Sequence, residues 1–572
     1  MSLIHQARFE RTLDQLLIHC ANSGAASVEA WTFDDAESRR QAEAQLAALG
    51  VTARIRSSYK PLLHWFLEEI EIETLQSVQI LYPRHHGCGD NRFLLEAYPL
   101  GALLGDATLS FAPSETDSLL YQVTLLDKQG RSSSHDVFAP NRLHTDFVGE
   151  ELLSPTGWLV LDGQQGTRLE TDYEQVFEAA IAAVALHDWG SNEPYFEELN
   201  LAVTLPNKDC PIACGEEAIS LGEALHEDLY FSLLELFQKR SGRPLGDRGL
   251  QPGQIVPMVR YAPGPLTLRI ETRALATTDQ QAEFQPLAEA VGPLSAAQVG
   301  AELTKIEGQP FAAQSRSGRA IEGRYHPGAD RAVMISGGQH PNETTGIVGA
   351  LRAAQALALR PQAHFTISPL ENPDGYQVHW RLRADNPAHM HHAARYTALG
   401  DDLEYRSAEP LWEKAIRVEA ERLSGAKLHL NLHGYPAHEW TRPLSGYVPR
   451  NFAMWTLPKG YFLIIRHHID WQQTAKNLTD RVTARLAEIP GLVDANRKQI
   501  ALYETHAGAT GFQVINGFPC LISVDERHSV PLTLITEYPD ETIYGQAFIT
   551  GHNAQTAFVL AAYDAYQALD LG

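Results

Sequence analysis

Cysteine is scarce in this sequence. Its 572 residues include five cysteines, at positions 20, 88, 210, 214 and 520. A sparse, odd number does not build a disulfide framework, so we expect a reducing compartment such as the cytoplasm. Cys210 and Cys214 form one close pair, but no second pair of cysteine or histidine residues follows nearby at zinc-site spacing, so we expect no metal there.

Long apolar runs are also missing. None approaches 18 residues, which predicts no membrane-spanning helix. The first residues are charged from Arg8 onward and lack a continuous apolar stretch. They predict an amphipathic helix over residues 5–20 rather than a signal peptide.

Basic residues are too few to balance the acidic ones. Lys and Arg number 46 and Asp and Glu number 70, giving a formal charge of −24. That charge repels phosphate backbones and argues against nucleic acid or an anionic membrane as a partner. Hydrophobic residues at 44% and charged residues at 20% exclude disorder and collagen-like repeats. At roughly 150 residues per domain, the length predicts three or four domains.

Residues 1–294 predict an α+β half in two regions. Residues 1–165 begin with alternating helix and strand patterns and continue as short β-rich segments, one of them Arg92–Tyr98. Residues 166–294 carry a strong helix pattern at Gly222–Lys239 and end in a polar linker. No chemistry is identifiable here, and we expect this half to shape or cover a cleft, or to mediate assembly into a homo-oligomer.

The helix pattern at Gly222–Lys239 contains one polar stretch that could suggest a site. Leu225-His226-Glu227-Asp228 places three polar side chains together. We expect them to be exposed polar positions rather than ligands, because solvated helix faces are common.

Residues 295–572 show the alternating strand and helix patterns of an α/β domain. Helix patterns separate the strand patterns, which lie at residues 331–336, 364–369, 427–433, 520–524 and 532–537. This order predicts a mixed, mostly parallel sheet flanked by helices.

The first candidate for chemistry follows the strand RAVMIS. The next residues, GGQHPNETTG, place His340 and Glu343 in a glycine-rich loop. An imidazole and a carboxylate three residues apart can turn toward one metal when the loop is tight, and paired glycines permit such a backbone. A hydrolytic zinc site needs three protein ligands and one open position. Alone, the motif is equally compatible with a surface loop before a helix.

The second candidate is His433, at the end of the strand pattern KLHLNLHG. Ligands of open α/β sheets collect at the carboxyl ends of strands. His340 also follows a strand, so we expect the two histidines to face one crevice. His438 lies beyond the strand end and His429 in mid-strand, and both rank below His433.

The third candidate is Glu537, which ends the apolar strand pattern LTLITE. A carboxylate there can take a proton from a metal-bound water and return it to the leaving group. Glu541, Glu504 and Asp525 are alternatives.

Together these motifs resemble the zinc metallocarboxypeptidases, the family of carboxypeptidases A and B and the cytosolic carboxypeptidases. The order His-x-x-Glu, Asn-Pro-Asp-Gly, strand-end His and Thr-Glu before a Gly is similar over about residues 295–572. The resemblance implies a carboxypeptidase-like domain with one zinc ion held by His340, Glu343 and His433. It implies Glu537 as the general base and acid.

The resemblance also implies an arginine that stabilises the tetrahedral oxyanion. It should follow the turn Asn372–Gly375, and Asn372 itself is a candidate substrate contact. Arg381 is favoured and Arg383 is the alternative, also a candidate for substrate binding. A guanidinium aimed at a developing oxyanion in a dry site is worth roughly 3 kcal/mol.

One stretch departs from the family pattern. Family members carry an Asn-Arg pair that grips the substrate's terminal carboxylate, whereas Glu404 and Tyr405 stand in that place, followed by Arg406. A glutamate repels a carboxylate. We therefore expect these three residues to bind substrate, with Glu404 facing a cationic or polar group unless Arg406 swings in. Metal-dependent hydrolysis is better supported than carboxypeptidase specificity.

The sequence thus predicts a zinc-dependent hydrolase whose partner is a peptide or a small amide. Two alternatives stay open. One is an amidase or deacylase acting on an N-acyl amino acid or a cell-wall fragment. The other is a binding protein whose site no longer turns over.

Overall fold

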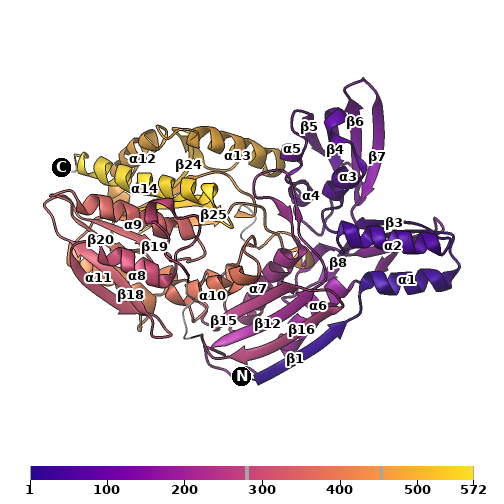
Figure 1. The fold of residues 1–572 in the computed structure, drawn as a ribbon, viewed down its shortest axis with the longest axis horizontal. Helices are drawn as coiled ribbons and strands as arrows, with labels where there is room; N and C mark the ends of the chain where they lie inside the picture. The colour runs from indigo at the N-terminus through magenta and orange to yellow at the C-terminus, as the bar shows by residue number, and fades with distance from the viewer. Residues whose placement is uncertain (1, 277–281, 451–454, 571–572) are drawn as a thin grey trace.

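The computed structural model describes residues 2–276, 282–450 and 455–570. One large sheet dominates the C-terminal half, and several smaller sheets build the N-terminal half (Figure 1). The expected mixed α/β fold class is confirmed. All five cysteines are free thiols. Within the described ranges, no helix combines the length and apolar character that a membrane crossing requires.

A nine-stranded mixed sheet forms the centre of the C-terminal half. In spatial order its strands are β17 (Gln309–Gln314), β18 (Ala320–His326), β20 (Phe365–Ser368), β19 (Val333–Gly337), β21 (Leu428–Pro436), β25 (Leu532–Glu541), β22 (Phe462–His467), β24 (Phe518–Val524) and β23 (Gln513–Ile515). Four neighbouring pairs are parallel, three of them in the central run β20-β19-β21-β25, and four are antiparallel. The parallel run brings the carboxyl ends of its strands to one edge, where His433 pairs with Glu537.

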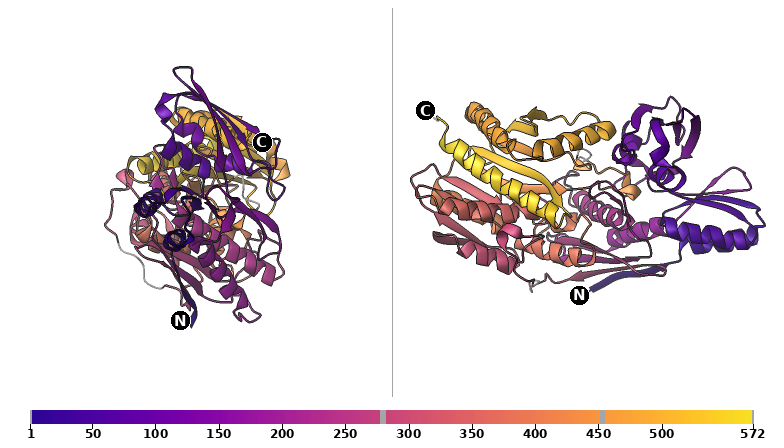
Figure 2. Two further views of the ribbon diagram at one scale, coloured as in Figure 1. Left: turned by 90° about the vertical axis from the view of Figure 1, so that its right-hand side faces the viewer. Right: turned by 45° about the horizontal axis from the view of Figure 1, so that its top comes forward.

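Helices cover both faces of this sheet (Figures 1 and 2). One face carries α9 (Thr344–Ala358), α12 (Gln472–Leu486) and α14 (Gln546–Gln567), and the other carries α11 (Ala415–Ser424). The alternation of β19 explains both layers. Val333 and Ile335 belong to the core under α9 and α14, whereas Met334 belongs to the core under α11.

Three four-stranded sheets make up most of the N-terminal half. The strands of the first sheet are, in spatial order, β1 (Ser2–Phe9), β16 (Leu266–Arg273), β12 (Glu198–Leu205) and β15 (Gln254–Tyr261). Those of the second are β11 (Thr167–Leu169), β10 (Gly157–Leu161), β2 (Ser27–Thr32) and β3 (Thr52–Ser57). Those of the third are β5 (Thr108–Pro113), β4 (Leu75–Tyr82), β6 (Leu120–Asp127) and β7 (Ser132–Phe138). The first sheet joins the start of the chain to residues 198–273. The two N-terminal regions expected from the sequence therefore share a sheet.

The longer helices of this half are α1 (Thr12–Ser23), α2 (Ala36–Ala48), α3 (Pro61–Glu69), α6 (Asp172–Leu186) and α7 (Leu221–Arg240). The last of them confirms the helix predicted at Gly222–Lys239. Helix α6 begins with a complete capping box between Thr171 and Glu174. The Ser220 side chain caps α7 by accepting from the Glu223 amide.

Two local predictions are wrong. The chain forms β1 up to Phe9 and begins α1 only at Thr12, because β1 pairs antiparallel with β16 at the far end of this half. Local periodicity cannot reveal so distant a partner. The expected strand Arg92–Tyr98 is instead the short helix α4 (Arg92–Glu96), in which Arg92 and Glu96 form a buried ion pair one turn apart.

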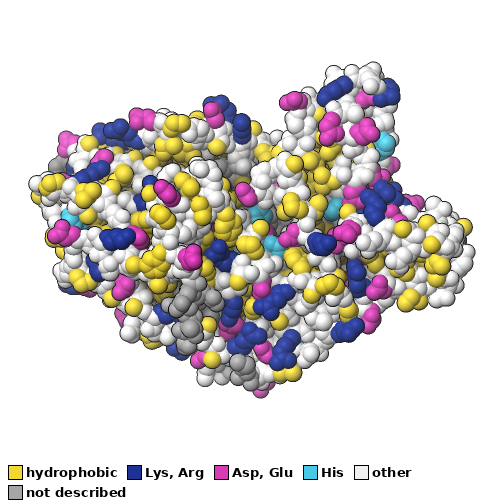
Figure 3. Space-filling view, viewed as in Figure 1, with side chains coloured by type: hydrophobic (Ala, Val, Ile, Leu, Met, Phe, Trp, Pro, Cys, Tyr) yellow, Lys and Arg dark blue, Asp and Glu magenta, His cyan; other side chains and the backbone are white. Residues whose placement is uncertain are grey.

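The main hydrophobic core of the N-terminal half extends into the C-terminal half. The cluster under α6 and α7 also contains Val378 and Leu382 of α10 (Pro373–Asp385), as well as Trp440. Helix α7 lies at this junction, and its residues His226, Glu227 and Asp228 are almost fully buried. The expectation that they are exposed is therefore wrong. Figure 3 shows histidine side chains gathered where the two halves meet.

Candidate metal centre and active site

Three predicted ligands converge from two elements. His340 and Glu343 lie in the loop between β19 and α9, and His433 lies on β21. His340 Nδ1 is 2.9 Å from Glu343 Oε1, and His433 Nδ1 is 2.8 Å from Glu343 Oε2. The two Nδ1 atoms are 3.0 Å apart. All three side chains are buried, and one donor atom from each lies within 4.8 Å of the others.

The path of the loop depends on Gly338. This residue has φ +63°, and a Cβ atom there would lie 2.9 Å from Leu370 Cδ1 and 3.1 Å from Leu370 Cα. A side chain would meet both the left-handed backbone penalty and this contact. Glycine therefore permits the tight turn that brings His340 over the end of β21.

The donor set fits zinc. Burial lowers the pKa of His433, which favours the neutral imidazole that binds a metal. Burial alone would raise the pKa of Glu343, but His340, His433 and Arg395 hold it below its usual value, so the carboxylate stays charged. Two imidazole nitrogens and one carboxylate, all directed at one point, match the ligands of a hydrolytic zinc site.

A second layer of side chains orients these ligands. His340 Nε2 is 3.3 Å from Asp402 Oδ2, an arrangement that fixes the ring and leaves Nδ1 for the metal. Gln339 donates to Asp402 at 2.9 Å and accepts from Asn431 at 3.0 Å. Burial opposes ionisation of Asp402, yet His340 and Arg248 hold its pKa low.

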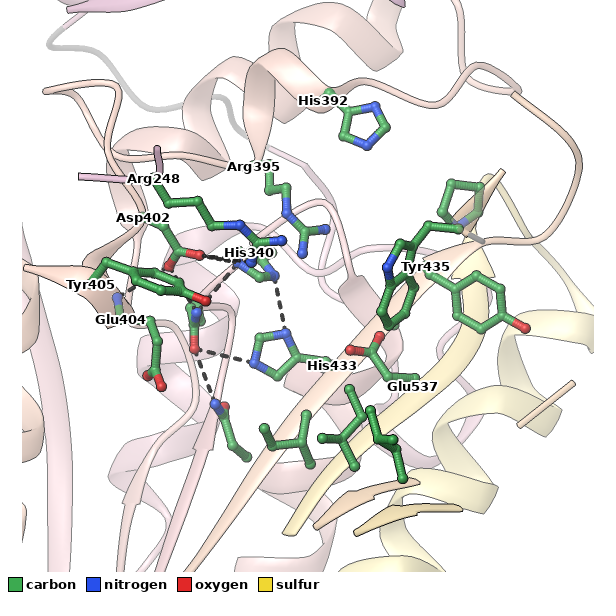
Figure 4. A pocket seen from close by; sticks show the side chains of 18 of the residues that line it. Arg248, His340, His392, Arg395, Asp402, Glu404, Tyr405, His433, Tyr435 and Glu537 are labelled. Carbon is green, nitrogen blue, oxygen red and sulfur yellow. Dashed lines mark hydrogen bonds and ion pairs between the residues drawn. The ribbon is translucent and has the colours of Figure 1, made fainter. Parts of the chain in front are cut away.

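Glu537 faces the same pocket. It lies on β25 directly beside His433, and both line a cavity of about 250 Å³. Figure 4 shows the Glu537 carboxylate directed into the pocket across from His340. Burial and the Glu343 charge raise the pKa of Glu537 well above its usual range, with Arg395 and Lys459 opposing. Such a carboxylate is suited to accept and return a proton.

The arginines expected at the oxyanion lie elsewhere. Arg381 donates to the buried Glu198 at 2.8 Å and does not line this pocket. Arg383 stacks on Trp380, with its guanidinium carbon 4.5 Å from the ring centroid. Both side chains leave α10 toward other neighbours, so the structure places neither at the metal centre.

Arg395 occupies the pocket instead. It donates to Glu343 Oε1 at 2.9 Å and lines the cavity with His340, His433 and Glu537. Burial opposes its charge, but Glu343 and other acidic neighbours keep its pKa above the usual value. Figure 4 shows its guanidinium group directed toward the ligand histidines.

Glu404 lines the pocket, but its carboxylate is already engaged. Arg417 donates to Oε2 at 2.7 Å, Arg466 donates to Oε1 at 3.1 Å, and His528 Nε2 lies 2.7 Å from Oε1. Burial would raise its pKa, but these neighbours hold it far below the usual value. The Glu404 charge is thus balanced within the protein, which corrects the expectation that it meets a cationic substrate group.

The remaining predicted substrate contacts divide between pocket and scaffold. Tyr405 lines the pocket. Arg406 is buried in ion pairs with Asp401 and Glu413, and it does not line this cavity. Asn372 caps α10 by accepting from the Gly375 amide at 2.9 Å, so its side chain serves the fold.

Sequence reasoning missed three pocket residues, namely Arg395, Asp402 and Arg248. Asp402 carried a usable signal, because it stands two residues before the position where the family pair is expected. Arg395 follows a short 3₁₀ turn rather than a patterned element. Arg248 belongs to the N-terminal half, which the motifs did not connect with the site.

Comparisons with known proteins return solved structures only. No family model matches the chain, and no curated protein matches it in sequence. A metallo-carboxypeptidase from Burkholderia cenocepacia is 15% identical with a TM-score of 0.30, over 54% of this chain and 77% of that one. A metallo-carboxypeptidase from Pseudomonas aeruginosa is 16% identical with a TM-score of 0.27, over 53% and 72%. The murein-tripeptide amidase MpaA from Escherichia coli O157 is 11% identical with a TM-score of 0.25, over 48% and 97%.

Proposed function

We propose that this chain is a zinc-dependent hydrolase that cleaves a peptide or related amide bond. The observation that carries the proposal is the convergence of His340, Glu343 and His433 in one buried site, with Glu537 on the adjoining strand facing the same cavity.

His340, Glu343 and His433 would hold the metal. When bound, zinc supplies Lewis acidity to the scissile carbonyl and lowers the pKa of water at the site. Asp402 fixes the His340 ring through Nε2, so that Nδ1 keeps its orientation.

Glu537 moves the protons. Its carboxylate takes a proton from the attacking water and passes it to the nitrogen of the leaving amine. Arg395 donates to the carbonyl oxygen as negative charge develops there, a role that a buried guanidinium performs without reorganisation.

The experiment joins metal analysis with one conservative substitution. The wild-type chain should hold one zinc ion and hydrolyse amides. Glu537→Gln should keep the metal and lose about 10²- to 10⁴-fold in kcat, as expected for loss of a general base. Glu541→Gln is the matched control, because Glu541 is also buried on β25 but does not line the pocket.

The substrate panel should pair peptides with N-acyl amino acids and with small amides. Amidase action on a small amide without a free carboxylate is the second candidate, favoured because Glu404 and Tyr405 stand where the carboxylate-binding Asn-Arg pair was expected. A wild type that holds no zinc, or a Glu537→Gln variant with full activity, would remove the proposed mechanism.

A further inference from the structure

His392 connects the active-site pocket with the N-terminal half. It begins the short 3₁₀ turn His392–Ala394 and lines the cavity together with Arg395 and Glu537. Its Nδ1 forms a hydrogen bond with the Glu227 carboxyl group of α7, and its backbone amide donates to the other oxygen of that group at 3.4 Å. Figure 4 shows the His392 ring beyond Arg395, set apart from the histidines of the metal centre. A carboxyl group of the N-terminal half thus orients a side chain of the pocket.

The surroundings of this pair determine where its protons lie. Burial raises the pKa of Glu227 well above its usual range, and the nearby Glu223 adds to that effect. Burial lowers the pKa of His392 well below its usual range, and the Arg395 charge adds to it. The Glu227 carboxyl group therefore donates to Nδ1 of a neutral imidazole. A neutral ring whose Nδ1 accepts carries its hydrogen on Nε2.

The Nε2 donor of His392 is open to the cavity. It has no hydrogen-bond partner among the residues that the structure describes, and it is not sealed inside the protein. The ring packs between Trp440 and Phe231, at centroid distances of 4.3 and 4.7 Å, while Glu227 holds its other nitrogen. The N–H group is therefore kept in place for an acceptor that a ligand supplies.

The acceptor at His392 belongs to a part of the substrate that does not react. The other two histidines of the cavity, His340 and His433, are at the metal centre, and Arg395 donates to the scissile carbonyl in the proposed mechanism. A neutral donor between aromatic rings suits a neutral acceptor, because an anion there would lose its hydration without gaining an opposite charge. An amide carbonyl oxygen is such an acceptor.

Resting on the proposed hydrolysis, we infer that His392 donates from Nε2 to a second amide carbonyl of the substrate, one that is not cleaved. The preferred substrate is then a peptide with at least two amide bonds rather than a small amide. Trp440 lines the cavity beside His392, and its flat indole offers an apolar surface to the same part of the peptide. The N-terminal half takes part in this specificity through Glu227.

The test measures kcat/KM for three substrates in the zinc-loaded full chain. The parent is an N-acetyl amino acid, whose only amide is cleaved. One derivative has an N-acetylglycyl group in place of the acetyl group, and the other is extended by a C-terminal glycine. His392→Phe keeps a flat ring and removes the donor, whereas His392→Gln keeps an N–H donor. His391→Phe is the matched control, because His391 is also buried in this segment but does not line the pocket.

We expect wild type to cleave one of the two derivatives with a kcat/KM about 5- to 20-fold above that of the parent. His392→Phe should remove this advantage, mainly through KM, and His392→Gln should retain part of it. The parent should change less than about twofold in either variant, and His391→Phe should match wild type. The derivative that responds assigns the second carbonyl to the acyl or to the amine side. No advantage of either derivative in wild type, or equal losses for all three substrates in His392→Phe, would overturn the inference.

Binding measured without hydrolysis separates this inference from the proposed function. Calorimetry with the zinc-loaded Glu537→Gln chain gives the affinity for each derivative. An affinity about 5- to 20-fold weaker when His392→Phe is added, with a wild type that hydrolyses nothing, would support the second-amide site and remove only the proposed hydrolysis. Hydrolysis by the wild type, with an affinity that His392→Phe does not change, would overturn the second-amide site and leave the hydrolase intact.

Discussion

Arg395 and Arg381 end in different surroundings, although one short stretch of chain carries both. Arg395 lines the pocket with Glu537, whereas Arg381 pairs with the buried Glu198 of β12. Arg395→Gln should lower kcat by about 10²- to 10³-fold, because the developing charge on the carbonyl oxygen loses its donor. Arg381→Gln should leave kcat within about twofold of wild type.

Because Arg395 also contacts Glu343, metal content must be measured beside kcat. A zinc-replete Arg395→Gln variant with normal kcat would contradict this role. A large loss in Arg381→Gln, at a temperature where the variant remains folded, would return the role to α10.

Some residues of the site could be predicted from the sequence and others could not. His340, His433 and Glu537 each follow or end a strand with a clear apolar pattern, so their meeting at one sheet edge could be anticipated. Arg395 lies between Asn386 and Leu411, where the chain forms only 3₁₀ turns. No periodicity indicates the direction of a side chain in such a stretch.

Helix α7 contributes buried carboxylates to the C-terminal half. Glu223 lies 2.8 Å from His438 Nε2, Glu227 pairs with His392, and Asp228 accepts from Ser445 at 2.6 Å. Polar residues on one helix therefore bind loops that precede and follow β21 in the chain. A solvated face was expected because the sequence does not reveal which element covers a helix.

The His438–Glu223 pair predicts a pH dependence of stability. Burial alone would lower the pKa of His438, but Glu223 raises it to about 9, above its ordinary value near 6.5. The folded-state pKa is raised, so the stabilisation is fully present below about pH 6.5 and disappears as pH rises through about 9. His438→Gln should lower the free energy of unfolding by roughly 2–3 kcal/mol near pH 6.5 and by little near pH 10.

Urea unfolding of the two proteins at both pH values measures this difference. His19→Gln is a suitable control because His19 is exposed on α1. A gap between wild type and His438→Gln that stays constant up to about pH 10 would argue against a charged pair.

We expect the whole molecule to unfold as one unit, because buried ion pairs join its two halves. Arg442 of the C-terminal half is completely buried and donates to Glu235 of α7 at 2.7 and 3.1 Å. Glu235→Leu leaves that buried guanidinium without its main partner, and we expect a loss of about 3–5 kcal/mol. Glu178→Leu, which removes a half-exposed partner of Arg142, should cost less than about 1 kcal/mol.

Unfolding in guanidinium chloride can be followed by two probes, tryptophan fluorescence and zinc release. Coincident midpoints, both shifted in Glu235→Leu, are the expected result. Separate midpoints would mean that the halves unfold independently despite their shared core.

For the whole molecule, the sequence predicted the α/β fold of the C-terminal half and the mixed α/β class of the protein. The strands and helices of the C-terminal half follow clear apolar patterns. The sequence could not connect Arg248 with the metal centre, because that contact joins two segments with no common motif. The strand Ser2–Phe9 was hidden for a similar reason, since its apolar residues are matched to Leu266–Arg273 and not to their own neighbours.

The pairing of β1 with β16 also affects when this sheet can form during synthesis of the chain. Ser2 finds its partner at Thr272, so β1 leaves the ribosome long before the strand that it pairs with. At roughly 5–20 residues per second, synthesis of the intervening chain takes on the order of 10 to 50 s. During that interval the backbone groups of β1 lack the only strand partner they have in this sheet, and we expect a chaperone that covers them to raise the yield of folded protein.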